Sequence, residues 1–206
     1  MTNFDALKNA VITGQRDAVT DIVKSAIAAG ENPNDLLDKA MIPAMREIGD
    51  RFSRNEVYVP ELLIAARAMQ SGLTLLEPLL ASSGRKDLGT VAIGTVKGDL
   101  HDIGKNLVAI MLKGAGYKVI DLGVNCDIAK FEEGVAQGAT IVALSALLTT
   151  TMPYMREIIE HFRGRDIKVI VGGAPITQAF ADEIGADGFS EDASGVVKLA
   201  DALRAS

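Results

Sequence analysis

Several common protein classes are excluded by what the sequence lacks. Its 206 residues include one cysteine, Cys126, so an intramolecular disulfide is excluded and a reducing compartment is favoured. No apolar run approaches the roughly 18 residues that a membrane-spanning helix needs. The first residues also lack a basic segment followed by an apolar core. We therefore expect a cytoplasmic protein that has no membrane contact.

Clustered positive charge is also missing. The formal net charge is -6, and lysine and arginine are not gathered in any one stretch. Proteins that bind nucleic acid through its phosphates need such clusters, so we expect no nucleic-acid partner. The hydrophobic content of 48% is ample for one large or two small cored domains.

Hydrophobic spacing in the first part of the chain is helical throughout. Apolar residues recur at i, i+3 and i+4 from residues 4 to 11, 19 to 27, 37 to 52 and 62 to 80. Asn32 and Pro33 form an N-cap signal for the third helix, and Pro43 predicts a kink within it. Four amphipathic helices with short links predict an antiparallel four-helix bundle over residues 1–84.

A different rhythm runs through residues 85–206, where short β-rich segments alternate with helical ones. We expect strands at residues 90–96, 117–122, 140–146, 167–171 and 187–190. We expect helices at residues 104–115, 127–137, 152–163, 176–184 and 193–204. Five such units predict an α/β domain of the flavodoxin-like Rossmann type, with a five-stranded parallel sheet in the order 2-1-3-4-5.

Residues 96–105 are the main candidate for a functional site, because they contain one of only two histidines in the chain. They connect the first expected strand to the following helix, where parallel sheets place their ligands. His101 is therefore a candidate metal ligand, and Asp99 is a candidate for the carboxylate that orients its imidazole. The alternative is a loop histidine that caps the helix or pairs with Asp102.

Two glycines flank this histidine and contribute to the prediction. Gly98 and Gly104 permit backbone conformations that a β-carbon resists, and they leave room for a large ligand. Because the stretch 97–105 is rich in glycine and aspartate, we expect it to have little to pack against and to be mobile.

Other polar and glycine-rich segments converge on the same edge of the expected sheet. Residues 145–151 follow the third strand, and residues 172–175 follow the fourth. A response-regulator receiver has the same topology, but Ser145 and Ser190 stand where it needs an aspartate and a lysine. A flavodoxin needs a phosphate-cradling loop after its first strand, and residues 97–101 do not provide one.

Three motifs in order carry a resemblance to a known family. The pattern Asp99-x-His101-x-x-Gly104, followed by Ser145-x-Leu147 and then Gly172-Gly173, resembles the cobalamin-binding signature of methionine synthase and of corrinoid methyltransferase proteins. The preceding bundle resembles the helical cap of this family, so the similarity covers nearly the whole chain.

The resemblance implies a bound cobalamin or related cobamide in the base-off, His-on state. His101 would be the lower axial ligand of cobalt, Asp99 would bind its other nitrogen, and Thr151 would complete a relay in which methionine synthase has a serine. These three residues would carry the chemistry. The expected cofactor-binding set also contains Gly98, Asp102, Ile103, Gly104, Ser145, Leu147, Thr149, Gly172 and Gly173. In the cap, Phe52 and Val59 match positions over the upper corrin face, with bundle core as their alternative role.

By the same resemblance, the chain is a corrinoid methyl carrier that depends on other proteins and is not a complete enzyme. It would accept a methyl group on Co(I) from a substrate methyltransferase. It would then donate that group from methyl-Co(III) to a second methyltransferase, with tetrahydrofolate or coenzyme M as acceptor. A reductive activator would be a third partner. A cobalamin-binding sensor and the small subunit of a cobalamin-dependent mutase are the alternatives.

The sequence leaves several points open. These are the methyl donor (methanol, a methylamine, a quaternary amine or an aryl methyl ether), the acceptor, the cobamide's lower base, the oligomeric state and the roles of Cys126 and His161.

Overall fold

The computed structural model describes residues 3–82 and 87–205, and the chain divides into two compact units. One unit comprises Met1–Lys86 with Gly114–Gly116, and the other comprises Asp87–Lys113 with Tyr117–Ser206. The predicted boundary between residues 84 and 85 lies outside the described residues.

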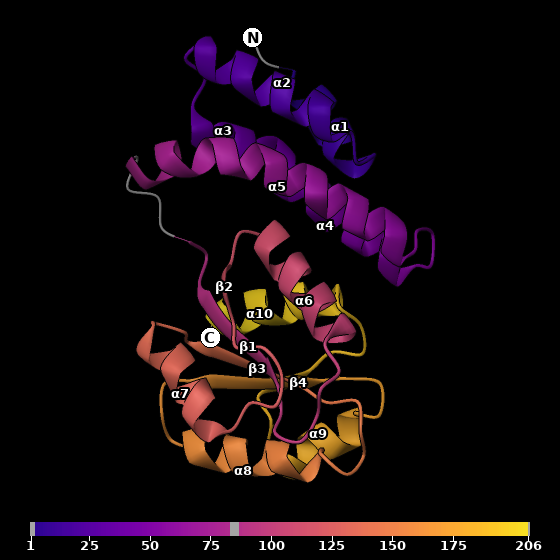
Figure 1. Ribbon diagram of the computed structural model, residues 1–206, viewed down its shortest axis with the longest axis vertical. Coiled ribbons are helices and arrows are strands. Elements are labelled where there is room, and N and C mark those ends of the chain that lie inside the picture. The colour runs from indigo at the N-terminus through magenta and orange to yellow at the C-terminus, as the bar shows by residue number, and fades with distance from the viewer. Residues whose placement is uncertain (1–2, 83–86, 206) are drawn as a thin grey trace. The chain divides into compact units, whose positions relative to one another are not determined.

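The first unit is helical, as the apolar spacing predicts. Its elements are α1 (Phe4–Ile12), α2 (Arg16–Ala28), α3 (Pro33–Leu36), the π-helical segment η1 (Leu37–Met41), α4 (Ile42–Ser53) and α5 (Val59–Ser82). Because α3, η1 and α4 follow one another without a break, residues 3–82 form four helical segments joined by short links (Figure 1). Their apolar faces meet in a core that includes Leu7, Val11, Val23, Met41, Met45, Ile48, Leu62 and Leu76.

Proline explains the irregular middle of the third helical segment. The Asn32 side chain accepts a hydrogen bond from the backbone N–H of Asn34, which confirms the predicted cap. Pro43 lacks an N–H, and its ring excludes the carbonyl one α-helical turn earlier. Directly before it the chain forms a π-helical turn, in which the N–H of Ile42 donates to the carbonyl of Leu37. The predicted disturbance therefore takes the form of a π-helical turn.

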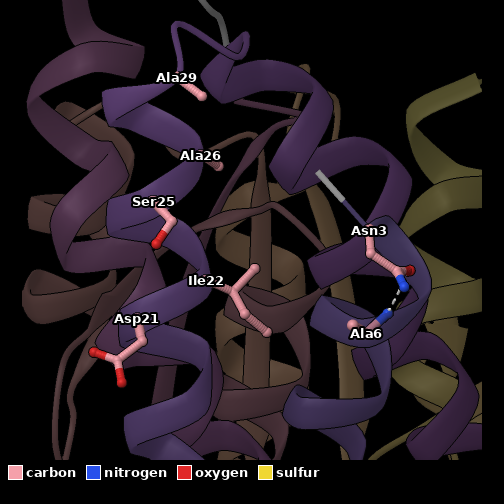
Figure 2. A pocket seen from close by; sticks show the side chains of 7 residues that line it. All are labelled: Asn3, Ala6, Asp21, Ile22, Ser25, Ala26 and Ala29. Atoms are coloured by element: carbon pink, nitrogen blue, oxygen red, sulfur yellow. Dashed lines mark hydrogen bonds between the residues drawn. The ribbon is translucent and has the colours of Figure 1, made fainter. Parts of the chain in front are cut away.

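Small side chains leave a groove between α1 and α2. It has a volume of about 420 Å³ and is lined by Ala6 on α1, by Asp21, Ile22, Ser25 and Ala26 on α2, and by Ala29 just after α2 (Figure 2). Asn3, which also lines the groove, caps α1 by accepting a hydrogen bond from the N–H of Ala6.

The second unit contains the predicted sheet. Its strands are β1 (Thr90–Thr95), β2 (Lys118–Asp121), β3 (Ile141–Ser145), β4 (Lys168–Gly172) and β5 (Gly188–Phe189). All are parallel and lie in the order β2-β1-β3-β4-β5, which confirms the predicted topology. In the central pair, Thr95 of β1 lies opposite Ser145 of β3. The carboxyl ends of these two strands are therefore level with each other.

Helices cover both faces of this sheet. They are α6 (Ile103–Gly114), α7 (Ile128–Ala136), α8 (Pro153–Phe162), α9 (Gln178–Ile184) and α10 (Gly195–Ala205). Figure 1 shows α7, α8 and α9 on one face and α6 with α10 on the other. Buried residues such as Phe131, Met155 and Phe162 join the first group to the sheet. Because both faces are covered, β1 is a nearly continuous apolar run.

A charged cluster links α7 to the end of α8 on the surface. Glu132 accepts hydrogen bonds from Nε2 of His161 and from the guanidinium of Arg165. His161 also lies edge-on to the ring of Phe162. The hydrogen bonds from Arg165 and His161 outweigh partial burial and lower the pKa of Glu132 to about 2 from an ordinary 4.5. His161, whose role the sequence leaves open, thus has a structural partner.

This cluster predicts a pH-dependent difference between the wild type and Glu132→Gln. A carboxyl whose pKa is lowered by folding contributes stability above its unfolded pKa, and this contribution is lost as the pH falls through the folded pKa. We expect the wild type to resist urea better than the variant at about pH 7. The difference should shrink as the pH falls from about 4.5 towards 2.

The matched control is Glu133→Gln, an exposed position next to Glu132 on α7. If Glu133→Gln shows the same pH-dependent difference in urea unfolding, the assignment to the Glu132 cluster is wrong.

Candidate functional site

The loop between β1 and α6 lies where the sheet changes direction. Strands β2 and β3 pair with opposite sides of β1, so their following segments meet this loop from two sides. In doubly wound sheets such a switch point at the carboxyl ends of the strands is the usual ligand site. The loop that carries His101 occupies this place, as predicted.

Asp99 is the centre of the loop, because its side chain is completely buried and accepts five hydrogen bonds. Oδ1 accepts from the backbone N–H of His101 at 3.1 Å and contacts its ring Nδ1 at 2.7 Å. Oδ2 accepts from the N–H groups of Leu147 and Leu148 at 2.8 and 3.1 Å. It also accepts from the hydroxyl of Thr151 at 3.1 Å.

These contacts keep Asp99 ionised. Burial by itself would raise the pKa of the carboxyl, but the hydrogen bonds from Leu147, His101 and Leu148 outweigh it. The pKa of Asp99 consequently lies well below its usual range. An ionised carboxylate only accepts hydrogen bonds, so Nδ1 of His101 must carry the hydrogen. In a neutral imidazole this leaves the lone pair on Nε2, the atom that can ligate a metal.

The imidazole of His101 is open to the outside. Its side chain is 50% exposed, and no described residue contacts its Nε2 atom. Large apolar side chains surround it in sequence and across the strands, with Leu100 71% and Ile103 80% exposed. Leu147 and Leu148, which bind Asp99 through their backbones, also expose their side chains. A nitrogen donor thus stands among exposed apolar side chains, which is typical of a surface that a ligand or partner covers.

The alternative pairing of His101 is wrong. Asp102 does not contact the imidazole. It begins the turn into α6, where its carbonyl accepts from the N–H of Asn106 and its carboxylate accepts from the Asn106 amide. His101 pairs with Asp99, because Asp99 lies beneath it and Asp102 faces the helix.

The expectation that the loop has little to pack against is also wrong for two residues. Asp99 is fully buried, and Lys105 is only 2% exposed. The ammonium of Lys105 contacts both carboxylate oxygens of Asp121 at the end of β2. Asn125, in the loop after β2, accepts from the N–H of Gly98 at 2.8 Å. These contacts were missed, although charged residues at two neighbouring strand ends were the available signal.

The two glycines beside His101 have different roles. Gly98 has a φ of +85°, a conformation that favours glycine. Gly104 lies in the first turn of α6, so the expectation of an unusual backbone there is wrong. A β-carbon at position 104 would meet no atom within 4 Å. The fold itself therefore does not require glycine at position 104.

The ends of β3 and β4 approach each other closely. Ser145 lies opposite Gly172 in the sheet, and both are half-buried. Gly173 has a φ of +135°, and a β-carbon there would lie 1.9 Å from the carbonyl oxygen of Ala146. Thr149, in the loop after β3, is exposed. The predicted slot residues therefore stand at one edge of the sheet, and Gly173 is required by a backbone contact.

Phe52 and Val59 belong to the helical unit. Phe52, on α4, is half-buried, and Val59, the first residue of α5, is 36% exposed. Neither belongs to the buried core of residues 3–82. Their alternative role as core residues is not supported. Cys126 is fully buried and donates a hydrogen bond to the carbonyl of Leu122, so it is a packing residue in the β2–α7 loop.

No group of three or more His, Cys, Asp or Glu side chains that could hold a metal ion is present among residues 3–82 and 87–205. Within the same ranges, no helix has the length and apolar character needed to cross a membrane.

Comparison with family models identifies both units. Residues 89–198 match a B12 binding domain, and residues 4–77 match a second model that is also described as a B12 binding domain. Together the two matches include the His101 loop and the bundle that contains Phe52 and Val59.

Curated relatives cover almost the whole chain. A corrinoid protein of Desulfitobacterium hafniense is 38% identical over 211 residues, which is 98% of each chain. A trimethylamine corrinoid protein of Methanosarcina barkeri is 42% identical over 207 residues, covering 93% of this chain and 95% of the relative.

Solved structures show the same fold. A chain of the methanol:cobalamin methyltransferase complex of M. barkeri has a TM-score of 0.87 and 30% identity, and the match covers 98% of this chain and 79% of that one. A cobalamin-binding protein of D. hafniense has a TM-score of 0.82 and 28% identity, with 98% and 99% covered.

The hydrogen bonds to Asp99 predict that Asp99→Asn destabilises the cofactor-free protein. The groups around Asp99 are all hydrogen-bond donors. In either orientation of the asparagine amide, its NH2 group would therefore face another donor, and a hydrogen bond would be lost. We expect the free energy of unfolding in urea to fall by about 1–3 kcal/mol. Asp102→Asn, at an exposed carboxylate, is the control and should change it by less than about 0.5 kcal/mol. Equal losses in the two variants would contradict the role given to Asp99.

The close approach at Gly173 predicts that Gly173→Ala is costly. The β-carbon would clash with the Ala146 carbonyl in addition to straining the backbone. We expect a loss of about 2–4 kcal/mol in urea unfolding. Gly138→Ala is the control, because Gly138 also has a positive φ but has open space at its β-position. The free energy of unfolding of Gly138→Ala should fall by only about 1 kcal/mol. If Gly173→Ala also loses only about 1 kcal/mol, the predicted clash with Ala146 is wrong.

Proposed function

Because the chain belongs to the family of B12-binding corrinoid proteins, we propose that it carries a methyl group between two methyltransferases on a bound cobamide. The observation that carries this proposal is the pairing of Asp99 with His101, which leaves Nε2 without a partner in the described residues. One imidazole is a sufficient protein donor for a metal that brings its other ligands with it, as cobalt does in a corrin ring. The donor set therefore fits the cofactor.

His101 is proposed as the lower axial ligand, in the base-off, His-on state. Its nitrogen donor is placed among exposed apolar side chains, notably those of Leu100 and Ile103, which suit the flat apolar underside of a macrocycle. Gly98, Asp102 and Gly104 complete the loop that would lie below the ring. The open space at Gly104 supports this assignment.

When bound, the cobalt supplies a centre that accepts a methyl group from one partner and yields it to the next. The protein's task is to control the imidazole below it. Asp99 holds a hydrogen on Nδ1 and thereby keeps Nε2 available as a donor. The same 2.7 Å contact would hold the imidazole in one orientation below the cobalt.

Thr151 suits the third place in this relay. Its hydroxyl lies 3.1 Å from Oδ2 of Asp99 and 2.8 Å from the carbonyl oxygen of Leu148, and it has one hydrogen to share between them. The hydroxyl can donate to the ionised carboxylate as a serine hydroxyl would, which supports threonine as a substitute for serine.

The displaced nucleotide tail of the cofactor is proposed to enter at the ends of β3 and β4. Ser145, Leu147 and Thr149 offer polar and apolar contacts there, and Gly172 with Gly173 keeps the approach free of side chains. In the helical unit, Phe52 and Val59 are proposed to cover the upper face of the ring. Their position outside the bundle core supports this role.

The partners are proposed to be a substrate methyltransferase, an acceptor methyltransferase and a reductive activator. Relatives named trimethylamine and dimethylamine corrinoid proteins, and a structural neighbour from a methanol:cobalamin methyltransferase complex, support a methylamine or methanol as donor. Tetrahydrofolate or coenzyme M is the proposed acceptor.

Reconstitution tests this function directly. Wild-type protein, His101→Ala and the control His161→Ala are mixed anaerobically with hydroxocobalamin, desalted and reduced to Co(II). We expect the wild type and His161→Ala to retain the cofactor, with nitrogen coupling from one imidazole in the spin-resonance spectrum. His101→Ala should lose that coupling and retain cofactor more weakly, because only the tail slot then holds it. A colourless wild type, or unchanged coupling in His101→Ala, would overturn the proposal.

A further inference from the structure

Lys105 is a buried lysine with a complete set of partners. Its side chain is 2% exposed, and its ammonium lies 2.6 and 2.7 Å from the two carboxylate oxygens of Asp121. A third contact of 2.6 Å joins it to Oδ1 of Asn106. The three hydrogens of the ammonium have three acceptors, so Lys105 is saturated within the protein. It is therefore a fixed internal contact and not a ligand for substrate.

Stability is a poor explanation for this arrangement. Removing an ammonium from water costs several kcal/mol, which a buried pair repays only in part. Asp121 is itself 39% exposed, so water weakens the attraction. What such a pair does well is to hold two elements in one relative position. Lys105 joins the first turn of α6 to the last residue of β2.

A second contact reaches the other end of the His101 loop from the segment that follows β2. Asn125 has a φ of +52°, a conformation that asparagine tolerates better than most residues. In this conformation its Oδ1 accepts from the N–H of Gly98 at 2.8 Å. Its own N–H donates to the carbonyl of Asp99 at 3.0 Å. Asn125 thus contacts Gly98 and Asp99, two of the three residues that directly precede His101.

Together these contacts fasten the loop on both sides of the imidazole. Asn125 holds the chain before His101, and Lys105 holds the helix after it. Between them, the hydroxyl of Thr95 donates to the carbonyl of His101 at 2.8 Å. The contacts of Asp99 described above fasten the loop to β3, whereas Lys105 and Asn125 fasten it to β2. His101 lies between these attachments, and its side chain is 50% exposed.

We propose that Lys105, Asp121 and Asn125 form a β2 brace that positions His101 for ligation of the cobalt. The inference rests on the proposed function, because it assigns a task to residues that do not touch the cofactor. The brace fixes the backbone of the loop, so that binding and release of the metal move the imidazole and leave α6 in place. Preorganisation of this kind strengthens a bond by removing the cost of ordering the ligand at the moment of binding.

A double-mutant cycle separates positioning from general support. The dissociation constant for hydroxocobalamin is measured for Lys105→Met, Asn125→Gly and Asn125→Asp, each in the wild-type and in the His101→Ala background. Asn125→Gly keeps the positive φ and removes the acceptor, whereas Asn125→Asp keeps both. Lys118→Met, at an exposed lysine on the same strand, is the control.

In the wild-type background we expect Lys105→Met and Asn125→Gly to weaken binding roughly tenfold, as loss of an outer partner of a metal ligand does. Asn125→Asp and Lys118→Met should bind like the wild type. In the His101→Ala background none of the four should change the dissociation constant further. Equal losses in both backgrounds, or none in either, would overturn the brace.

Hydrogen exchange of the cofactor-free protein gives a readout that does not depend on cobamide. The amide of Gly98 should exchange faster in Asn125→Gly than in Asn125→Asp, because only the first variant lacks its acceptor. Equal exchange in the two variants would also overturn the brace. If the wild-type protein binds no cobamide, the proposed function is wrong. If the wild type binds cobamide but the brace variants have the same effect in both backgrounds, only the brace is wrong.

Discussion

A carboxylate removed from water must have its charge balanced by hydrogen bonds, and the site around Asp99 is built to satisfy that need. Five donors from two segments of the chain form hydrogen bonds to this carboxylate, and these hydrogen bonds also hold the two segments in place. The backbone donors of the β3–α8 loop fix the carboxylate, and the carboxylate in turn fixes the tautomer of His101. One buried charge thus determines which nitrogen of the imidazole faces outward.

The parallel sheet makes this convergence possible. Because β1 lies between β2 and β3, the loop after β1 receives contacts from the loops on both sides. The β3 side supplies donors to Asp99, and the β2 side supplies Asp121 and Asn125 as partners of Lys105 and Gly98. When a metal binds an imidazole on a flexible loop, part of the binding free energy is lost in ordering the loop. Under the proposed function, the contacts on both sides of the His101 loop would meet that cost during folding.

Two charged residues of this loop, Asp99 and Lys105, are buried and paired, while the large apolar side chains of Leu100 and Ile103 are exposed. This is the reverse of the usual surface pattern. Such an inversion is stable only because the inward charges have complete partners, and it is useful only if something apolar covers the outward side chains. Under the proposed function, the corrin ring of the cobamide would be that cover.

The sequence by itself determined the elements and their order, because periodicity is a local property. The helical spacing before residue 85, the five β-rich segments and the pairing of Asp99 with His101 along one loop were all predictable from neighbouring residues. Tertiary structure alone decided that Lys105 is buried, that Asn125 holds Gly98, and that Gly173 must lie against Ala146. Those outcomes depend on which strand ends become neighbours in the sheet. Hydrogen bonds between residues far apart in the chain produce no periodic pattern in the sequence, so they could not be predicted from it. The place of Gly104 in a regular helix was likewise decided by the fold, because the sequence alone did not show that α6 begins at Ile103.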